Sequence, residues 1–415
     1  MRIHLHDFAG HPFQAQLSRA LCAAGHEVEH GFAAQYRSGK GSLSVRPADP
    51  AGLSFTPFAT VRPFVKYGLT ERLRYEREYA RQLTRHLVRT RPDVTVLTNV
   101  PLLIMHSVHG RLTAEGLPWV LWHQDLMSVA MARELRARLP SPLAGILSRE
   151  LKRRERACVI GARAVVAIGP AFLDEYQNWG IRRDDLFQVP NWAPLDEVFP
   201  VSRQNDWAAR HGLAVDRLRL IYSGTLGRKH NPLLLVQLLR QCEARNIDVD
   251  LTVVSEGDGA DVLRSELDGE PHARVLPFQP MAELGELLSA SDVLVAILEP
   301  AAAGFSIPSK VLTYLAAGRP VLGLMPKDNP ATQDIIAAGG FADEPTESGV
   351  LRAASWLRDV SRSPGELSRI AARSRSVAEA RFDIKVIAGR FESILDSSRR
   401  TDPARLTVGG GGQRP

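Results

Sequence analysis

Ser306, Ser309 and Lys310 stand at the start of a stretch, Gly304 to Gly323, that reads GFSIPSKVLTYLAAGRPVLG. A periodic apolar run follows them and Gly318 ends it, which predicts a helix with a left-handed closing residue. Either serine can accept hydrogen bonds from the amides of the first turn. Such a helix N-terminus attracts anions through its unpaired amides and its dipole, and an anion would also stabilise Lys310. A capped surface helix with a solvated lysine would show the same pattern.

A second group of candidate residues lies in loops that follow predicted strands. Arg228 and Lys229 are cations close to Gly224 and Thr225, in a loop whose glycines let the backbone approach a ligand. The segment Gly257-Asp258-Gly259 follows the next predicted strand. Loops at the carboxyl ends of parallel strands share one edge of a sheet, so these cations and the helix N-terminus could together neutralise a diphosphate. Because no acidic cluster accompanies them, we expect no metal ion in this site.

A histidine with catalytic potential, His123, ends an apolar run that begins at Trp119. Gln124 and Asp125 follow it directly, and Asn99 ends a comparable run earlier in the chain. Ligand groups gather at the carboxyl ends of parallel strands, which favours a chemical role for the histidine. A hydrogen-bonded structural histidine is the alternative for a single histidine at a strand end.

Alternating strand-like and helix-like segments must position these residues. The alternation predicts an α/β fold of two Rossmann-like, doubly wound domains that face each other across a cleft. We expect an N-terminal domain over residues 1–200, joined by a C-terminal helix over residues 382–399, and a second domain over residues 207–381.

Three less regular segments accompany these domains. The Pro-rich, acidic segment from Ala193 to Asp206 is the expected linker between them. Residues Tyr36 to Phe64, marked by glycine and proline, are expected to form a long loop on the active face. Residues 400–415 have the composition of a disordered tail.

The composition bounds the class of protein. The chain has 415 residues, of which 44% are hydrophobic and 24% charged, as in ordinary globular proteins of two domains. Its cysteines, Cys22, Cys158 and Cys242, lie far apart and in no metal-like spacing, which favours a reducing compartment. The first residues do not resemble a signal peptide, no run is apolar enough to span a membrane, and the net charge of +6 favours anionic partners.

Two basic segments have more than one interpretation. Residues Glu71 to Arg91 predict a helix whose apolar positions are four apart and whose remaining circumference carries arginines. The second segment, Arg149 to Arg156, reads RELKRRER. Both would suit a solvated face or a contact with an anionic membrane surface, whereas nucleic acid is not expected because no binding module accompanies them.

The phrases of the second half, taken in order, resemble a known family. YSGTLGRKH, VVSEGDG, VLPF, SASDVLVAI and PSKVLTYLAAGRPVLG are similar to the donor-binding domain of retaining glycosyltransferases of family four, which have the glycosyltransferase-B fold. In the first half AAGHEV, LWHQDL and VPNW agree with that resemblance. The PNW and PSK phrases look closest to bacterial surface-polysaccharide enzymes such as fucosamine or colanic-acid glycosyltransferases.

The resemblance implies a donor site in the second half. Arg228 and Lys229 would hold the donor diphosphate, the turn at Phe278 and Gln279 would receive the nucleotide base, and the amides at Ser309 would face the phosphates. The implied donor-binding residues are Gly224, Thr225, Gly257, Phe278, Gln279, Ser306, Ser309, Lys310 and Thr313.

In the first half the resemblance implies catalytic and acceptor residues. His123 would lie near the donor sugar and act in catalysis together with Arg228 and Lys229. Gly10 and His11 would lie where the acceptor enters, and Asp125 would belong to the same side.

The chain departs from the family at two glutamates that members carry eight positions apart. Thr313 occupies the place of the second, and Ala303 or Phe305 occupies the place of the first. Threonine can still hydrogen-bond a ribose hydroxyl, but without the strength of a carboxylate. Sugar recognition is therefore expected to differ from the family pattern.

We expect from these features a transferase that moves a sugar, with retention, from a UDP- or GDP-sugar to a glycan or polyprenyl-linked acceptor. The expected setting is cell-surface glycan biosynthesis in the cytoplasm or at the inner face of the membrane, without a cofactor. A catalytically inactive partner protein and a nucleotide-sugar epimerase or hydrolase on the same fold are the alternatives.

Overall fold

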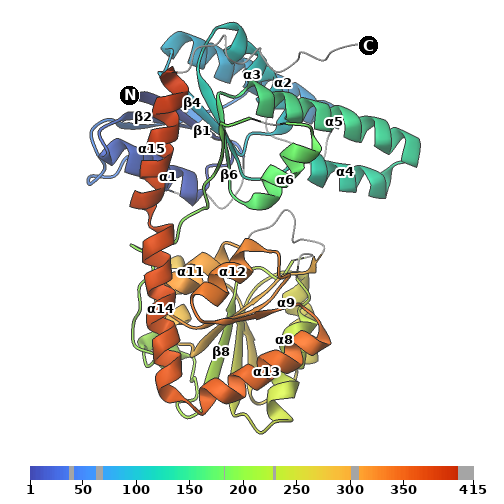
Figure 1. The fold of residues 1–415 in the computed structure, drawn as a ribbon, viewed down its shortest axis with the longest axis vertical. Helices are drawn as coiled ribbons and strands as arrows, with labels where there is room; N and C mark the ends of the chain where they lie inside the picture. The colour runs from blue at the N-terminus through green and yellow to red at the C-terminus, as the bar shows by residue number, and fades with distance from the viewer. Residues whose placement is uncertain (37–41, 62–68, 182, 228–229, 301–307, 401–415) are drawn as a thin grey trace. The chain divides into compact units, whose positions relative to one another are not determined.

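The chain folds into two compact units in a computed structural model that describes residues 1–36, 42–61, 69–181, 183–227, 230–300 and 308–400. Unit 1 comprises Met1–Pro190 and the chain from Ile384 onward, and unit 2 comprises Asn191–Asp383 (Figure 1). The division falls earlier than the expected boundary at residue 200, since Ala193 and Val198 are buried in the core of unit 2. The expected tail over 400–415 lies almost wholly outside the described residues.

Unit 1 is built on a parallel seven-stranded sheet of order β3-β2-β1-β4-β5-β6-β7. All-parallel sheets are buried on both faces, and accordingly every residue of β4, β5 and β6 is buried. The strands are β1 (Arg2–Asp7), β2 (Glu27–Ala33), β3 (Leu53–Phe58), β4 (Val94–Thr98), β5 (Trp119–His123), β6 (Ala164–Ala167) and β7 (Leu186–Gln188).

The expected long loop over Tyr36 to Phe64 is wrong in one respect, because it contains the edge strand β3. Its sequence, LSFTPF, lacks a continuous apolar run and includes Pro57. Proline has no N–H for the sheet ladder, but an edge strand needs its ladder on one side only. The strand pairs in register with β2, from Val28 opposite Leu53 to Ala33 opposite Phe58.

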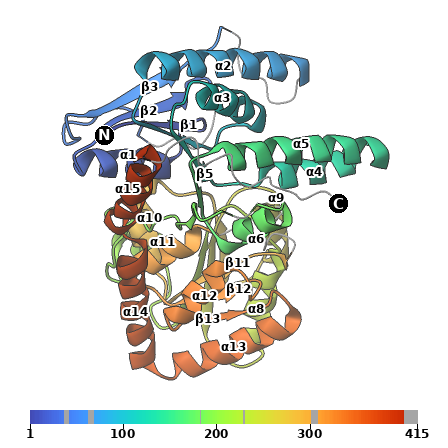
Figure 2. The same ribbon diagram turned by 45° about the horizontal axis from the view of Figure 1, so that its top comes forward.

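Helices cover the sheet of unit 1. They are α1 (Pro12–Ala23), α2 (Leu69–Thr90), α3 (Leu102–Ala114), α4 (Met127–Arg138), α5 (Ser141–Gly161), α6 (Pro170–Asn178) and α15 (Ile384–Arg400). The apolar stripe expected on α2 is confirmed, since Tyr75, Tyr79, Leu83 and Leu87 are fully buried. α2 lies beside α3, and α4 pairs with α5 in a hairpin (Figures 1 and 2).

Unit 2 has a parallel six-stranded sheet of order β10-β9-β8-β11-β12-β13. Its strands are β8 (Leu218–Ser223), β9 (Val249–Val254), β10 (Ala273–Leu276), β11 (Val293–Ile297), β12 (Val321–Leu324) and β13 (Phe341–Asp343). Its helices are α7 (Asp206–Arg210), α8 (Leu233–Glu243), α9 (Asp258–Glu266), the 3-10 turn η1 (Met281–Glu283), α10 (Leu284–Ser289), α11 (Lys310–Ala316), α12 (Pro330–Ala337), α13 (Glu347–Ser361) and α14 (Pro364–Phe382).

Successive strand residues of unit 2 enter two different cores, as the period of two requires. In β11, Leu294 and Ala296 pack with α10, α11 and α14, whereas Val293, Val295 and Ile297 pack with α8 and α13. Both faces of the sheet are therefore covered by helices, as expected for a doubly wound domain. None of the helices in the described ranges is both long and apolar enough to cross a membrane.

Candidate active site

A pocket of about 740 Å³ opens at the carboxyl ends of the strands of unit 2. Ser223 ends β8, Val254 ends β9 and Leu298 follows β11, so the pocket lies where ligands bind in open α/β sheets. Its volume is in the range of small-molecule sites, about 300–1,000 Å³. Its other walls are Gly224, Thr225, His230, Phe278, Gln279, Pro280, Met281, Leu284, Leu287, Leu288, Pro308, Ser309, Lys310, Thr313 and Tyr314.

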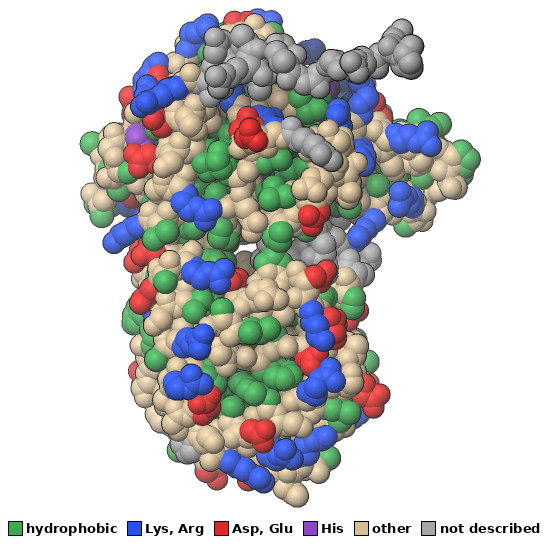
Figure 3. All heavy atoms as spheres, viewed as in Figure 1, with side chains coloured by type: hydrophobic (Ala, Val, Ile, Leu, Met, Phe, Trp, Pro, Cys, Tyr) green, Lys and Arg blue, Asp and Glu red, His purple; other side chains and the backbone are tan. Residues whose placement is uncertain are grey.

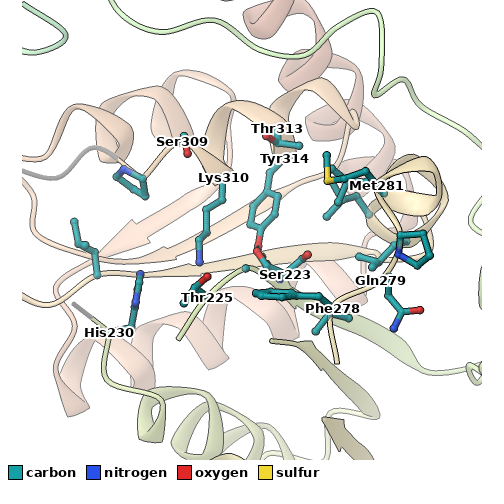
Figure 4. Close-up of a pocket in the computed structure, with 18 residues that line it drawn as sticks. Ser223, Thr225, His230, Phe278, Gln279, Met281, Ser309, Lys310, Thr313 and Tyr314 are labelled. Atoms are coloured by element: carbon teal, nitrogen blue, oxygen red, sulfur yellow. Dashed lines mark hydrogen bonds between the residues drawn. The ribbon is translucent and has the colours of Figure 1, made fainter. Parts of the chain in front are cut away.

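Lys310 places a cation in this pocket. The residue as a whole is half-buried, but its ammonium group is enclosed: it donates to the Tyr222 hydroxyl and lies 3.9 Å from the centroid of that ring. Burial lowers the pKa of Lys310 to about 7. In Figure 4 its side chain extends toward Thr225, with His230 at the same end of the pocket. An anionic ligand would restore the charge that burial disfavours.

Tyr314 holds the helix that carries Lys310 against the end of β8. Its hydroxyl donates to the carbonyl oxygen of Ser223 and accepts from the amide of the same residue, both at 2.9 Å. The Tyr222 hydroxyl in turn donates to the carbonyl of Thr225 at 3.1 Å. These bonds fix the turn after β8 relative to α11, so that Thr225 and Lys310 face the same space.

Gly224 makes the close approach of the lysine feasible. Its φ is 138°, and a Cβ built there would lie 3.0 Å from Lys310 Nζ and 3.1 Å from Lys310 Cε. A side chain at this position would strain the backbone and displace the ammonium group. The group that lies close to Gly224 in the structure is therefore the side chain of Lys310, whereas the sequence predicts a ligand there.

The opposite end of the pocket is apolar. Phe278, Gln279 and Met281 lie together there in Figure 4, and Leu284 and Leu287 of α10 also line the pocket. Phe278 and Met281 are 44% and 73% exposed, although large apolar side chains usually bury their surface. An exposed aromatic ring beside a polar pocket suits stacking with a flat ligand group.

The structure brings together most of the predicted donor residues. Seven of them line this one pocket: Gly224, Thr225, Phe278, Gln279, Ser309, Lys310 and Thr313. Gly257 does not line it and instead precedes α9 with a φ of 98°. Arg228, Lys229 and Ser306 lie outside the described residues, as do Ala303 and Phe305.

Of the two serines expected to cap the helix, Ser306 lies outside the described residues and Ser309 does not cap it. Its backbone is already helical, with φ −56° and ψ −22°, and its side chain makes no capping hydrogen bond. The amides of Val311 and Leu312 bond instead to the carbonyls of Pro308 and Ser309. The left-handed residue expected at the other end is confirmed, since Gly318 has a φ of 59°.

Sequence reasoning missed Tyr222 and Tyr314 as site residues. Both are almost fully buried, and burial raises the pKa of each phenol. In the sequence they are indistinguishable from core aromatics of a strand and a helix. His230 also lines the pocket, and its place there could not be predicted from its spacing in the sequence.

In unit 1, His123 is enclosed rather than exposed. Its Nε2 donates to Glu155 at 3.1 Å, its Nδ1 lies 2.6 Å from the Tyr176 hydroxyl, and the residue is 1% exposed. Glu155 also accepts from the amides of Met127 and Ser128 at the start of α4. The alternative of a hydrogen-bonded structural histidine therefore describes the geometry, although His123 still forms part of a pocket wall.

The pocket beside His123 has a volume of about 270 Å³ and includes His11 and Asp125. Gly10 has a φ of 74° and belongs to the turn that precedes α1. Buried Asp7 organises this turn, because it accepts from the amide of His11 at 2.5 Å and from Asn99 Nδ2 at 3.0 Å. Burial raises the pKa of Asp7 despite these hydrogen bonds.

Comparison with known proteins identifies the family. Residues 10–192 match the glycosyl transferase 4-like domain, and residues 217–350 match the glycosyl transferases group 1 family. The chain belongs to glycosyltransferase family four. The probable glycosyltransferase WbjE of Pseudomonas aeruginosa is 26% identical over 258 residues, and the match spans 57% of this chain and 58% of that relative.

Solved structures share the fold of this glycosyltransferase. Sucrose-phosphate synthase of Thermosynechococcus elongatus has a TM-score of 0.68 at 15% identity, over 95% of this chain and 98% of that one. HepE of Anabaena, solved in complex with UDP and glucose, has a TM-score of 0.68 at 15% identity, over 96% and 100% of the two chains. The two parallel-sheet units are those of the glycosyltransferase-B fold.

Proposed function

We propose that this family-four glycosyltransferase transfers a sugar, with retention, from a nucleotide diphosphate sugar to a lipid-linked or polysaccharide acceptor in cell-surface glycan biosynthesis. The observation that carries the proposal is the pocket of unit 2, which combines an apolar end at Phe278 with a cationic end at Lys310. A nucleotide diphosphate has the same two ends, a flat base and an anion.

The donor would lie along this pocket. Its base would stack near Phe278, its ribose would lie near Thr313, and its diphosphate would meet Lys310 and the hydroxyl of Thr225. Arg228 and Lys229, which follow in the same loop, would add charge at the diphosphate. HepE binds UDP, so UDP and UDP-sugars are the first donors to test, followed by their GDP counterparts.

Charge stabilisation is the chemistry that these residues can supply. As the bond between the anomeric carbon and the diphosphate oxygen breaks, negative charge collects on the departing diphosphate. The acceptor oxygen forms the glycosidic bond, and its proton passes to the departing diphosphate. Cations already in place stabilise that charge without reorganisation, and loss of one such group costs about 2.7–4 kcal/mol in barrier height. No step requires a metal ion in this proposal.

A thermal-shift screen of nucleotides and nucleotide sugars tests the donor assignment. A ligand at a hundred times its Kd stabilises the native state by about 2.7 kcal/mol, which is readily detected. We expect one base to be preferred, with the nucleotide diphosphate binding more tightly than the monophosphate. Equal binding of the nucleoside and its diphosphate would contradict a cationic diphosphate site.

Turnover with the preferred donor separates transfer from the alternatives. A transferase should consume the donor rapidly only when a glycan or polyprenyl-linked acceptor is present, and the product anomer should match the donor anomer. Release or isomerisation of the sugar without acceptor would indicate a hydrolase or epimerase. Nucleotide binding without turnover across donors and acceptors would indicate an inactive partner protein.

We further propose that the α4–α5 hairpin contacts an anionic membrane at the cytoplasmic face, where lipid-linked acceptors would be met. The first turns of α5 expose Leu143, Ile146 and Leu147, with Ile146 62% exposed. Exposed basic residues, Arg149, Lys152 and Arg153, follow on the same helix. Figure 3 shows hydrophobic and basic side chains next to one another over this hairpin, the pattern of an interfacial helix.

Co-sedimentation with vesicles tests this contact. Each basic residue near an anionic surface contributes about 1 kcal/mol, so a triple Arg149→Glu, Lys152→Glu, Arg153→Glu variant should lose binding to phosphatidylglycerol vesicles. The matched control changes Arg77, Arg81 and Arg85 to Glu on the exposed face of α2. Loss of vesicle binding in the α2 variant alone would assign the membrane contact to α2 and contradict its assignment to the α4–α5 hairpin.

A further inference from the structure

Three potential metal ligands meet between α3 and α5, on elements that the donor site does not use. His106 and His109 lie one turn apart on α3, and Cys158 lies near the end of α5. One ring nitrogen from each histidine and the cysteine sulfur all lie within 4.8 Å of one another. α3 and α5 pack side by side, which brings the three groups together (Figure 1).

These groups have no competing hydrogen bonds in the described part of the chain. The Nδ1 atoms of His106 and His109 are buried without a hydrogen-bond partner, and Cys158 is a free thiol that is fully buried. Buried polar nitrogens are normally paired, and each unpaired group costs about 1–3 kcal/mol. A ligand bound to these residues would account for why two histidines with unpaired ring nitrogens lie beside one free thiol.

The rings of His106 and His109 are closely packed by neighbouring residues. The ring of His109 lies against Gly161, where an added Cβ would be 2.9 Å from Nδ1. The ring centroids of His106 and His109 are 5.1 Å apart, and Trp119 closes the other side at 5.9 Å from His109.

A second histidine cluster in unit 1 provides a contrast. His4 and His86 both donate to Glu29, at 2.9 and 2.8 Å, and Thr56 donates to the other carboxylate oxygen. The carboxylate of Glu29 therefore pairs with one ring nitrogen of each histidine, although Nε2 of His4 is buried without a hydrogen-bond partner. Among the described residues, no side-chain hydrogen bond joins His106, His109 and Cys158.

We propose that His106, His109 and Cys158 bind a thiophilic divalent cation of the zinc class. Two imidazole nitrogens and a thiolate are the ligands that Zn²⁺ prefers, at about 2.0–2.1 Å for nitrogen and 2.3 Å for sulfur. Tetrahedral bonds of that length put ligand atoms on the order of 3.5 Å apart, so small side-chain movements complete the site. A water molecule would take the fourth position.

The cation would tie α3 to α5. Glu155, which holds His123 and the start of α4, lies one helical turn before Cys158 on the same buried face of α5. A metal ion at Cys158 would therefore fix the helix that positions His123. Its role is structural, and it is separate from the donor pocket in unit 2.

Cobalt substitution tests the site directly. The full-length protein, freed of any histidine tag and stripped with a chelator under reducing conditions, is titrated with Co²⁺ while near-ultraviolet absorption is recorded. We expect a thiolate-to-cobalt charge-transfer band that saturates at one equivalent and disappears when Zn²⁺ displaces the cobalt. Zn²⁺ should also raise the Tm of the stripped protein.

Matched cysteine variants decide which thiol is responsible. The band should persist in Cys22→Ser and Cys242→Ser, whose thiols are also buried and free, and should be absent in Cys158→Ser. His106→Asn keeps the thiol and should weaken cobalt binding at least tenfold, and circular dichroism checks that each variant is folded. No charge-transfer band in the wild type, or an equal band in Cys158→Ser, would overturn the proposal, as would cobalt binding with only nitrogen and oxygen ligands.

Discussion

The ammonium group of Lys310 makes the clearest distinction between folding and function at the scale of one residue. It is enclosed beside Tyr222, and burial lowers its pKa from the ordinary 10.5 to about 7. A buried cation costs stability unless a charged partner lies beside it. Among the described residues no carboxylate forms an ion pair with Lys310, which supports the proposal that an anion binds beside it.

Replacing this lysine should separate activity from stability. Lys310→Met keeps the length of the side chain and removes the charge, so we expect turnover to fall by about 10²–10³. The same variant should unfold at a higher temperature at neutral pH without ligand, because the desolvation cost is removed. Lys327→Met, which changes an exposed lysine of unit 2, is the control and should change neither quantity appreciably. A fully active Lys310→Met enzyme would contradict the assignment.

The titration of Lys310 predicts how donor affinity depends on pH. If the ammonium form binds the diphosphate, affinity for a nucleotide sugar should weaken as pH rises through about 7, by up to tenfold per unit. Without ligand the sign for stability is opposite: since the folded pKa lies below the unfolded value of 10.5, the unfolded chain binds more protons in between, and stability rises with pH. Lys310→Arg should abolish the pH dependence of affinity, because arginine stays charged. Calorimetric titration from pH 6 to pH 9 measures both proteins, and identical profiles would refute the role of the lysine.

At the scale of elements, Tyr314 joins α11 to the end of β8. Tyr314→Phe would leave the amide and carbonyl of Ser223 without their partner, at a cost of about 1–3 kcal/mol. We expect a lower denaturation midpoint in urea and weaker nucleotide binding, since the turn at Thr225 is no longer fixed. Normal affinity together with lowered stability would limit Tyr314 to a folding role.

Glu155 joins α5, the start of α4 and His123. Burial alone would raise its pKa, but the hydrogen bond and charge of His123 and the bond to Ser128 lower it overall. Its contribution to stability is therefore present above the ordinary value of 4.5 and is lost as pH falls through the lower folded value. Glu155→Gln should be destabilised by a few kcal/mol at pH 7, as for a broken buried pair, and the difference from wild type should shrink on acidification. A Tm difference that is independent of pH would show that the carboxylate charge is not what stabilises this junction.

Sequence patterns predicted elements well where burial is uniform and less well at edges. The fully buried run Trp119–His123 is a strand with the predicted bounds, because a buried parallel strand reads as an unbroken apolar segment. β3 was missed because an edge strand that contains Pro57 does not show this signal. The helix predicted in Gly304–Gly323, with Gly318 as its closing residue, is confirmed. Whether Ser309 caps this helix depends on its own backbone angles, which the composition does not determine.

For the whole molecule, the described residues that line the proposed donor pocket all belong to unit 2, and this predicts how ligand stabilisation is distributed. Each unit has its own sheet and buried hydrophobic residues, so calorimetry should resolve two unfolding transitions. A nucleotide at a hundred times its Kd should stabilise the unit 2 transition by about 2.7 kcal/mol and leave the other nearly unchanged. A fragment spanning Asn191–Asp383, measured alone, assigns the transition. An equal shift of both transitions would contradict the confinement of the site to unit 2.

The two-domain architecture could be predicted because strands and helices alternate along the whole chain. Which side chains meet in a site could not be predicted, because these residues are far apart in the sequence. Lys310 was chosen for its place in a helix turn, but its contact with Tyr222 joins residues 88 positions apart. Likewise Cys158 has no metal-like spacing to other cysteines, and its neighbours His106 and His109 come from a different helix. Only the spacing of the two histidines, three residues apart on α3, was visible in the sequence.

The placement of α15 in unit 1 has a consequence for the order in which the protein is made. Phe391 of α15 packs on Trp122 with ring centroids 4.9 Å apart, and α15 also lies along α1 (Figure 1). During synthesis all of unit 2 leaves the ribosome before α15 does, so unit 2 can complete its core first. The N-terminal sheet, although translated earliest, must wait with Trp122 uncovered until the last helix arrives. Chains released after Asp383 should accordingly bind nucleotide and recruit chaperones to unit 1.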